Sequence, residues 1–148
     1  MKYSRVFCFL LVFTPALSWG NCLVTGLSLS FGTYEPFVAI PSDSNGLVEV
    51  LCDLNLSYQV TLDAGLNSQG SVITRQLRDA SGNSSLLYNL YLDPSFTLIW
   101  GTGEAGSEVF NGIGGGSSMQ IPVYGRIPGR QNVAPGVYTD NVVITVAW

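Results

Sequence analysis

Apolar and polar residues alternate in short runs along this chain, with the period of two that places successive side chains on opposite faces of a β-strand. The pattern is clearest at Leu56, Tyr58, Val60 and Leu62, which form one apolar row just before the turn-forming residues 64–65. No stretch of helical periodicity is long enough to predict a helix. The pattern therefore predicts an all-β chain.

Further short strands are predicted on either side of that row, separated by residues that favour turns. Strands are expected over residues 23–31, 47–53, 72–78, 86–92, 96–100, 118–124 and 141–148. Turns are expected at residues 42–46, 81–83, 93–95 and 124–131, and in the glycine cluster 112–116. Strands at these intervals are typical of an antiparallel β-sandwich, and the sequence shows no linker or repeat that would divide it into two domains.

The last predicted strand is apolar on both faces. One face carries Val142, Ile144, Val146 and Trp148, and the other carries Val143, Thr145 and Ala147. A strand of this kind must be covered, either by the rest of its own domain or by a partner. The alternation alone leaves both possibilities open.

The beginning of the chain has the pattern of a secretory signal. Lys2 and Arg5 precede an uncharged apolar run over residues 6–17, and residues 18–20 supply the small side chains that a signal peptidase reads. The alternative is a membrane anchor, but the run is shorter than the roughly 20 residues that a bilayer span needs. We therefore predict a cleaved signal over residues 1–20 and one β-sandwich domain over residues 21–148.

Cysteine usage agrees with export. Cys8 lies in the predicted signal, which leaves Cys22 and Cys52 as a pair in an oxidising compartment. We expect these two residues to form a disulfide, which would stabilise the fold by about 3 to 4 kcal/mol in the chain-entropy model. A zinc site is a weak alternative because the chain has no histidine to complete a zinc shell.

Charge and residue inventory argue against several function classes. Loss of the signal leaves four of the six basic residues against all ten acidic ones, a net charge of −6. Such a chain has no electrostatic drive toward nucleic acid or anionic lipid. With no histidine, Ser-His-Asp and Cys-His catalysis are excluded, and carboxylates such as Asp53 and Asp63 are interpreted as solvated surface. We predict a non-enzymatic protein with no cofactor and no metal.

Two local patterns imitate ligand loops. Residues 101–106 spell the glycine pattern of a dinucleotide loop, but they follow a predicted strand and open no predicted helix. Asp43, Asn45 and Gly46 match part of a calcium loop, but the later acidic ligand is missing. Both segments are interpreted as ordinary loops or turns.

A set of short motifs over residues 22–148 resembles the spore coat protein U domain family. The motifs are CLVT at 22–25, FGTYEP at 31–36, VLC at 50–52, LDAG at 62–65, Arg75, LYNLYLD at 87–93, WG at 100–101, VYGRIP at 123–128 and GVYTD at 136–140. In combination they are specific, although each is weak alone. That family in turn resembles the subunits of archaic chaperone-usher pili.

The resemblance implies an immunoglobulin-like sandwich that lacks its final strand. A periplasmic chaperone would lend a strand to the open groove, and a neighbouring pilus subunit would replace it after passage through an outer-membrane usher. The implied partner-strand interface is formed by Val142, Ile144, Val146 and Trp148. The implied location is the cell surface, reached through the periplasm, with roles in a fimbria, in adhesion and in biofilm.

Two further expectations concern the place of the chain in such a fibre. Only Asn21 separates the predicted cleavage site from Cys22, so the chain would accept a strand without donating one, as a tip subunit does. Loops carrying Phe37, Ile40, Phe110 and Ile113 would then be available for adhesion, although buried loop anchors explain these residues equally well. The alternative function is a self-contained secreted β-sandwich, either a coat protein or a carbohydrate-binding module, that does not polymerise.

Overall fold

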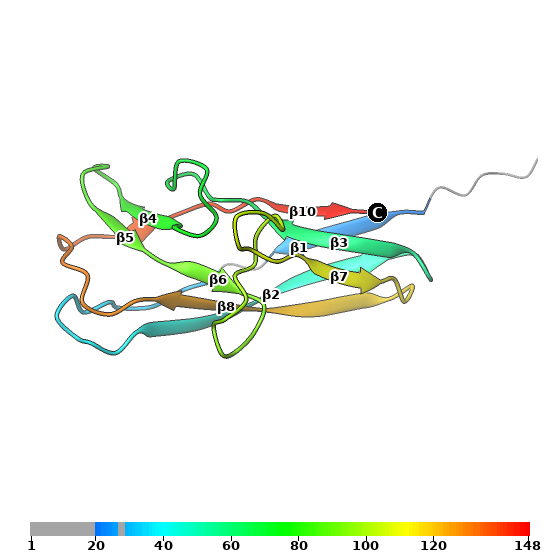
Figure 1. The fold of residues 1–148 in the computed structure, drawn as a ribbon, viewed down its shortest axis with the longest axis horizontal. Coiled ribbons are helices and arrows are strands. Elements are labelled where there is room, and N and C mark those ends of the chain that lie inside the picture. Colours follow the sequence, from blue (N-terminus) through cyan, green and yellow to red (C-terminus); the bar gives the residue numbers. More distant parts are fainter. Residues whose placement is uncertain (1–19, 27–28) are drawn as a thin grey trace, which may run out of the picture.

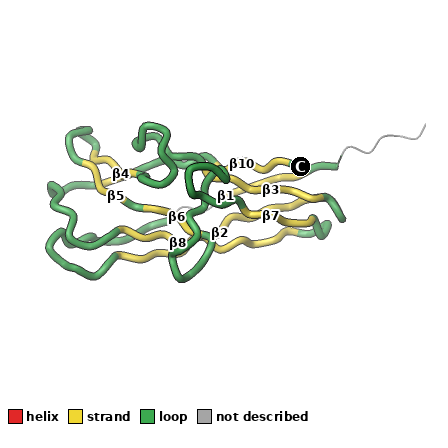
Figure 2. Tube along the Cα trace, viewed as in Figure 1, coloured by secondary structure: helices red, strands yellow, loops and turns green. Residues whose placement is uncertain are grey.

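The structure is a computed structural model that describes residues 20–26 and 29–148. It contains ten strands, and Figure 2 shows strands joined by loops throughout. The strands are β1 (Cys22–Gly26), β2 (Ser42–Cys52), β3 (Ser57–Leu62), β4 (Gln76–Asp79), β5 (Ser85–Leu87), β6 (Asn89–Tyr91), β7 (Phe110–Ile113), β8 (Ser118–Ile127), β9 (Tyr138–Thr139) and β10 (Ile144–Ala147). The predicted all-β class is confirmed. The predicted signal lies outside the described residues, apart from Gly20, and no described helix is long and apolar enough to cross a membrane.

The strands form three antiparallel sheets. The largest has the order β1-β2-β8-β6, the second has the order β10-β3-β7, and the smallest has the order β5-β4-β9. In Figure 1 the small sheet lies at the end of the molecule remote from the C-terminus, while β10, β3 and β7 lie near that terminus. The predicted antiparallel sandwich is therefore confirmed.

The core fills the space between the two larger sheets. The row predicted along β3 is buried, with 3%, 0% and 2% of Tyr58, Val60 and Leu62 exposed. Trp100 is fully buried beside this row, and its indole Nε1 donates a hydrogen bond of 2.9 Å to the Val60 carbonyl. Each fully buried apolar side chain of this size contributes about 1.5 to 3 kcal/mol, so this row provides much of the drive for folding.

The disulfide between Cys22 and Cys52 joins β1 to β2. Cys22 on β1 lies opposite Cys52 on β2, and the bridge links residues 30 positions apart. The expected pairing is thus present. It fixes β1 to the only strand with which it pairs within the described residues.

Two segments predicted as turns are strand. Residues 42–46 form the first half of β2, and residues 124–127 form the last part of β8, where the two strands continue one ladder. In that ladder Asp43 lies opposite Arg126, and the carboxylate accepts hydrogen bonds of 2.7 and 2.8 Å from the guanidinium. Polar residues at 42–46 were read as a turn, but they are polar because this part of the sheet is solvent-exposed on one face.

Five predicted strands are shortened or divided. Of residues 23–31 the described part is strand only as far as Gly26, and of residues 141–148 only Ile144–Ala147 is strand. Residues 86–92 split at Tyr88 into β5 and β6, which belong to different sheets, and of residues 72–78 only the last part is strand. Residues 96–100 form a turn and isolated bridges, because Phe96 has a left-handed φ of 57° and the Asp93 carboxylate accepts the amide hydrogens of Thr97 and Leu98. Local side-chain hydrogen bonds of this kind compete with a strand ladder.

The glycine cluster is divided in the same way. Gly112 lies within β7, and a Cβ at this position would be 2.3 Å from Cζ of the Tyr58 ring. Only glycine fits beneath that ring. The following glycines at 114–116 form the turn that the sequence predicted.

Candidate partner-strand groove

Two strand edges lie side by side without pairing. Within the described residues β10 pairs only with β3, and β1 pairs only with β2, although β1 and β10 are in contact (Figure 1). At the contact, a Cβ placed on Gly26 would be 2.4 Å from Cδ1 of Ile144. Side chains therefore close this part of the sandwich, while the backbone groups of both edges remain available for a further strand.

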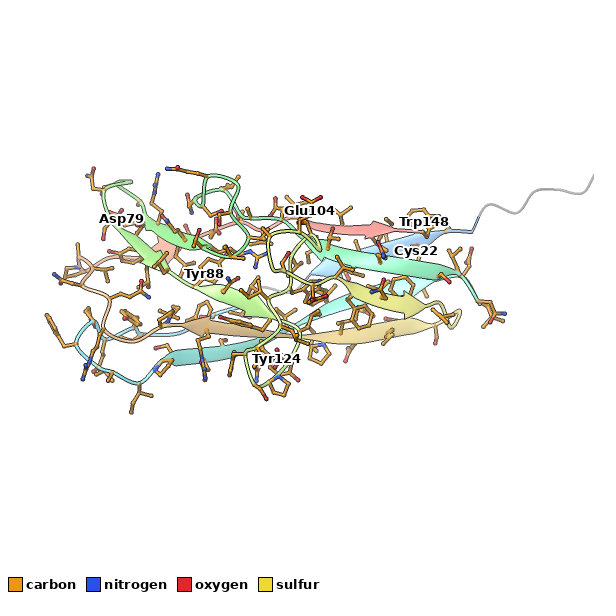
Figure 3. The ribbon with its side chains drawn as sticks, viewed as in Figure 1. Cys22, Asp79, Tyr88, Glu104, Tyr124 and Trp148 are labelled. Carbon is orange, nitrogen blue, oxygen red and sulfur yellow. A yellow bond between two sulfur atoms is a disulfide. The ribbon has the colours of Figure 1, made fainter. Side chains whose placement is uncertain are left out.

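The residues predicted to meet a partner strand divide into two groups. Val142, Ile144 and Val146 are half-buried and pack against the core, as the alternation predicted. Trp148 does not continue that row: it is 55% exposed, and its Nε1 donates a hydrogen bond of 2.7 Å to the Gly20 carbonyl. Figure 3 shows Trp148 and Cys22 at the same end of the molecule. Three of the four residues thus line the inner side of the terminal strand.

Beyond the contact of β1 with β10, the two sheets separate and leave a cleft. A hollow of about 290 Å³ is lined by Val142 and Ile144 on one side and by Leu29 and Phe31 on the other. It adjoins a larger hollow of about 710 Å³ that runs between residues 29–36 and 133–140 toward the far end of the sandwich. We call these two adjoining hollows, with the free edge of β10, the groove.

The far wall of the groove is formed by residues 29–34, which belong to no strand. They make no backbone-to-backbone hydrogen bond with another described residue. Instead, side chains hold the segment against the sheet. Leu29 and Phe31 cover Gly125 of β8, where a Cβ would lie 3.0 Å from Leu29 Cδ2 and 2.8 Å from Phe31 Cζ. The backbone on this side of the groove therefore also lacks a strand partner within the described residues.

A buried polar network joins the end of β3 to neighbouring segments, and the sequence alone did not indicate it. Arg75 is fully buried and donates hydrogen bonds to the carbonyls of Leu62, Asp63 and Trp100, at distances from 2.6 to 3.2 Å. It donates a further bond of 2.7 Å to Oδ1 of Asn89. Burial lowers the pKa of the Arg75 guanidinium from its ordinary value, and nearby anionic groups oppose that shift.

A second polar group lies at the junction of the two hollows. Tyr88 donates a hydrogen bond of 2.7 Å from its hydroxyl to Oδ2 of Asp140, whose Oδ1 accepts bonds from the amide of Leu66 and the side chain of Asn67. Burial, followed by the neighbouring Asp140 carboxylate, raises the pKa of Tyr88 far above its ordinary value. Asp140 thus fastens the start of the terminal segment to the loop that follows β3.

Two carboxylates considered as catalytic candidates have partners within the fold. Asp53 accepts the amide hydrogen of Asn21, and Asp63 accepts those of Gly65 and Val143. The structurally described part of the chain contains no cluster of three or more metal-ligating side chains.

The four residues considered for adhesion differ in their exposure to solvent. Phe37, Ile40 and Ile113 are 86%, 75% and 69% exposed. Phe110 is half-buried in β7 and packs near the Tyr58 and Trp100 rings, with ring centroids 6.4 and 6.2 Å away. Phe110 thus agrees with the alternative of a buried anchor, although it lies on β7 and not in a loop.

Comparisons with known proteins agree with one another. Residues 8–145 match the family model described as the Spore Coat Protein U domain. The chain is 35% identical over 132 residues to Protein U of Myxococcus xanthus, an alignment that covers 83% of this chain and 73% of that protein.

The structural comparison bears on the fold. The chain is similar, with a TM-score of 0.63 and 23% identity, to a chain in the crystal structure of the CsuC–CsuE chaperone–tip adhesion subunit pre-assembly complex from archaic chaperone-usher Csu pili of Acinetobacter baumannii. The similarity covers 88% of this chain and 40% of that chain, so the present chain spans less than half of that neighbour's length.

Proposed function

The chain belongs to the spore coat protein U domain family, and from this membership and the groove we propose that it is a structural subunit of a chaperone-usher type surface fibre, completed by a strand that a partner donates. The observation that carries the proposal is that, within the described residues, the free edge of β10 and the backbone of residues 29–34 lack strand partners on the two sides of an apolar cleft. Strand addition to such an edge satisfies backbone groups and buries alternate side chains.

The dimensions of the groove suit one extended segment. The hollows run alongside residues 133–144, and a strand of about ten residues rises about 3.3 Å per residue, which suits a segment of that length. Apolar side chains at alternate positions of the donated strand would complete the burial of Val142, Ile144 and Val146, which are half-buried without it. The partner-strand role of these residues, and the lesser role of Trp148 at the end of the row, are part of the proposal.

The proposal specifies a route and its partners. The chain would be exported by a signal over residues 1–20, and the domain over residues 21–148 would be held by a periplasmic chaperone before an outer-membrane usher passes it to other subunits at the cell surface. Mass spectrometry of the secreted protein tests the first step, because cleavage after Gly20 gives a mature chain that begins at Asn21.

Co-expression in an oxidising periplasm tests the central claim. We expect the domain to be recovered as a one-to-one complex with a candidate chaperone, and to be released when a peptide of about ten alternating apolar residues is added. Recovery of the same yield of cooperative, stable monomer without a chaperone, with no binding of the peptide, would refute strand donation.

One observation favours the alternative function. Ile144 reaches across to Gly26, so side chains of the chain itself hold β10 against β1 at the C-terminal end of the sandwich. The bond of Trp148 to Gly20 would be lost on cleavage after Gly20 and adds nothing to this closure. A domain closed in this way along its whole length would act as a self-contained secreted coat protein or binding module. The stable, peptide-insensitive monomer described above is the result that this alternative predicts.

A further inference from the structure

Arg75 is a buried cation. Within the described residues it forms no salt bridge with a carboxylate, whereas Arg126 forms one with Asp43. A buried charge needs substitutes for the water it has lost. Arg75 obtains them from neutral oxygens: the carbonyls of Leu62 and Asp63, that of Trp100, and the side chain of Asn89. These acceptors come from three separate segments of the fold: the end of β3, Trp100 and Asn89.

The shape of the guanidinium explains why arginine occupies this position. Its planar fork directs several N–H groups in fixed directions, whereas a lysine ammonium is a single compact donor on a flexible stem. The two N–H groups of Nη2 lie against three carbonyl oxygens, those of Asp63, Trp100 and Leu62, at 2.6, 2.8 and 3.2 Å, so that one N–H is shared between two acceptors. Arg75 therefore joins the end of β3 to the segment around Trp100.

The end of β3 is also where the terminal strand attaches. Asp63 donates its backbone N–H to the Val143 carbonyl at 3.1 Å, and its Oδ1 accepts the Val143 amide hydrogen at 2.9 Å. The ladder of β3 with β10 begins at the next pair, Leu62 with Ile144. The carbonyls of Leu62 and Asp63 are the ones that Arg75 holds, so one guanidinium sets the position of the strand that forms the edge of the groove.

We propose that Arg75 is a positioning residue for partner-strand binding: through Leu62 and Asp63 it places β10 where a donated strand can pair with it. The inference rests on the proposed function, although Arg75 is buried and touches no partner strand itself. A residue that only stabilised the core would weaken every part of the fold equally. Arg75 instead acts first on residues 143–144.

Three variants and one control separate these roles. Arg75→Lys keeps the charge and loses the fork, Arg75→Met removes both, and Asp63→Ala leaves Arg75 in place but removes the carboxylate that holds Val143. Ile121→Ala is the control, because Ile121 is 2% exposed in β8 of the other sheet and its truncation destabilises the core without touching this network.

The first measurement is hydrogen exchange at the Val143 amide in the secreted full domain. We expect exchange to be at least tenfold faster in Arg75→Lys and Asp63→Ala than in Ile121→Ala, after each is corrected for global stability by urea unfolding. If Arg75→Met fails to fold, the other two variants still decide the question. Asp63→Ala shows the exchange rate when the Val143 bond is lost. Val143 exchange in Arg75→Lys that follows global stability alone would overturn the inference.

The second measurement is binding of a ten-residue peptide with valine at alternate positions and threonine between them. We expect its dissociation constant to rise at least tenfold in Arg75→Lys and Asp63→Ala and to change less than twofold in Ile121→Ala. Unchanged peptide binding in the first two overturns the positioning role. If the unmodified domain binds neither this peptide nor a chaperone, the proposed function fails, while the exchange result still shows whether Arg75 holds Val143.

Discussion

Replacement of Ile144 by asparagine tests whether the inner face of β10 meets a partner strand. Ile144 is half-buried in the free subunit, and its neighbour Thr145 is exposed on the opposite face of the same strand. Full burial of an isoleucine contributes about 1.5 to 3 kcal/mol, so half-burial corresponds to about 1 kcal/mol. We expect Ile144→Asn to lower the free energy of unfolding of the free domain by about that amount.

A donated strand would raise the cost of the same substitution. It would cover the remaining surface of position 144, and burial of an uncompensated amide costs about 1 to 3 kcal/mol in proteins. The complex would therefore lose about 1 to 3 kcal/mol more than the free domain, which is a loss of affinity of about 5-fold to 150-fold. The matched variant Thr145→Asn introduces the same amide on the exposed face and should change affinity less than twofold.

Two assays separate the contributions. Urea unfolding gives the stability of each free variant, and titration of a fluorescent ten-residue strand peptide gives the affinity. The reasoning is refuted if Ile144→Asn and Thr145→Asn weaken peptide binding equally, since binding would then not depend on the inner face. It is refuted equally if Ile144→Asn lowers stability but leaves affinity unchanged.

Three further predictions concern stability. Replacing both Cys22 and Cys52 by alanine should lower the free energy of unfolding by about 3 to 4 kcal/mol, measured by urea unfolding against the oxidised parent, and a loss below about 1 kcal/mol would contradict the chain-entropy account. Trp100→Phe should cost about 1 to 3 kcal/mol in the same assay, because it leaves a buried carbonyl without its donor, and a neutral result would contradict that reading. The hydrogen bond from Arg126 lowers the pKa of Asp43. The Asp43–Arg126 pair therefore stabilises the folded state fully above the unfolded pKa of about 3.9, and this stabilisation is lost as the pH falls through the lower folded pKa. Because this pair is exposed, Asp43→Asn should cost only a few tenths of a kcal/mol at pH 6. This cost should fall progressively as the pH drops below about 3.9, and a cost that does not fall in acid would show that the pair is not the cause.

The sequence predicted the parts of the fold that depend on alternation. Tyr58, Val60 and Leu62 form a buried row because every second residue of a strand faces the same way. The disulfide was predictable because export leaves two cysteines. The first prediction needs only the alternation of neighbouring residues, and the second needs only the number of cysteines that remain after export.

The sequence failed where distant segments decide the local structure. Residues 42–46 are polar and contain glycine, yet they form strand because β8 supplies backbone partners along their length. Arg75 could be noted only as part of a family motif, since its four acceptors come together through the tertiary fold. Of the predicted interface, Val142, Ile144 and Val146 follow the alternation, whereas Trp148 departs from it through a contact with Gly20 that lies 128 positions away.

The chemistry of β10 bears on the choice between the two functions. Proteins that keep an edge strand in solution commonly protect it with charged residues, proline or a bulge. Residues 141–148 contain no charged residue and no proline that would protect the edge, although both occur elsewhere in the chain. The edge of β10 is nevertheless unpaired on one side within the described residues, and Val143 on its outer face is 58% exposed. A strand with these properties is better suited to be covered by a partner than to remain in water, which favours the fibre subunit over the self-contained coat module.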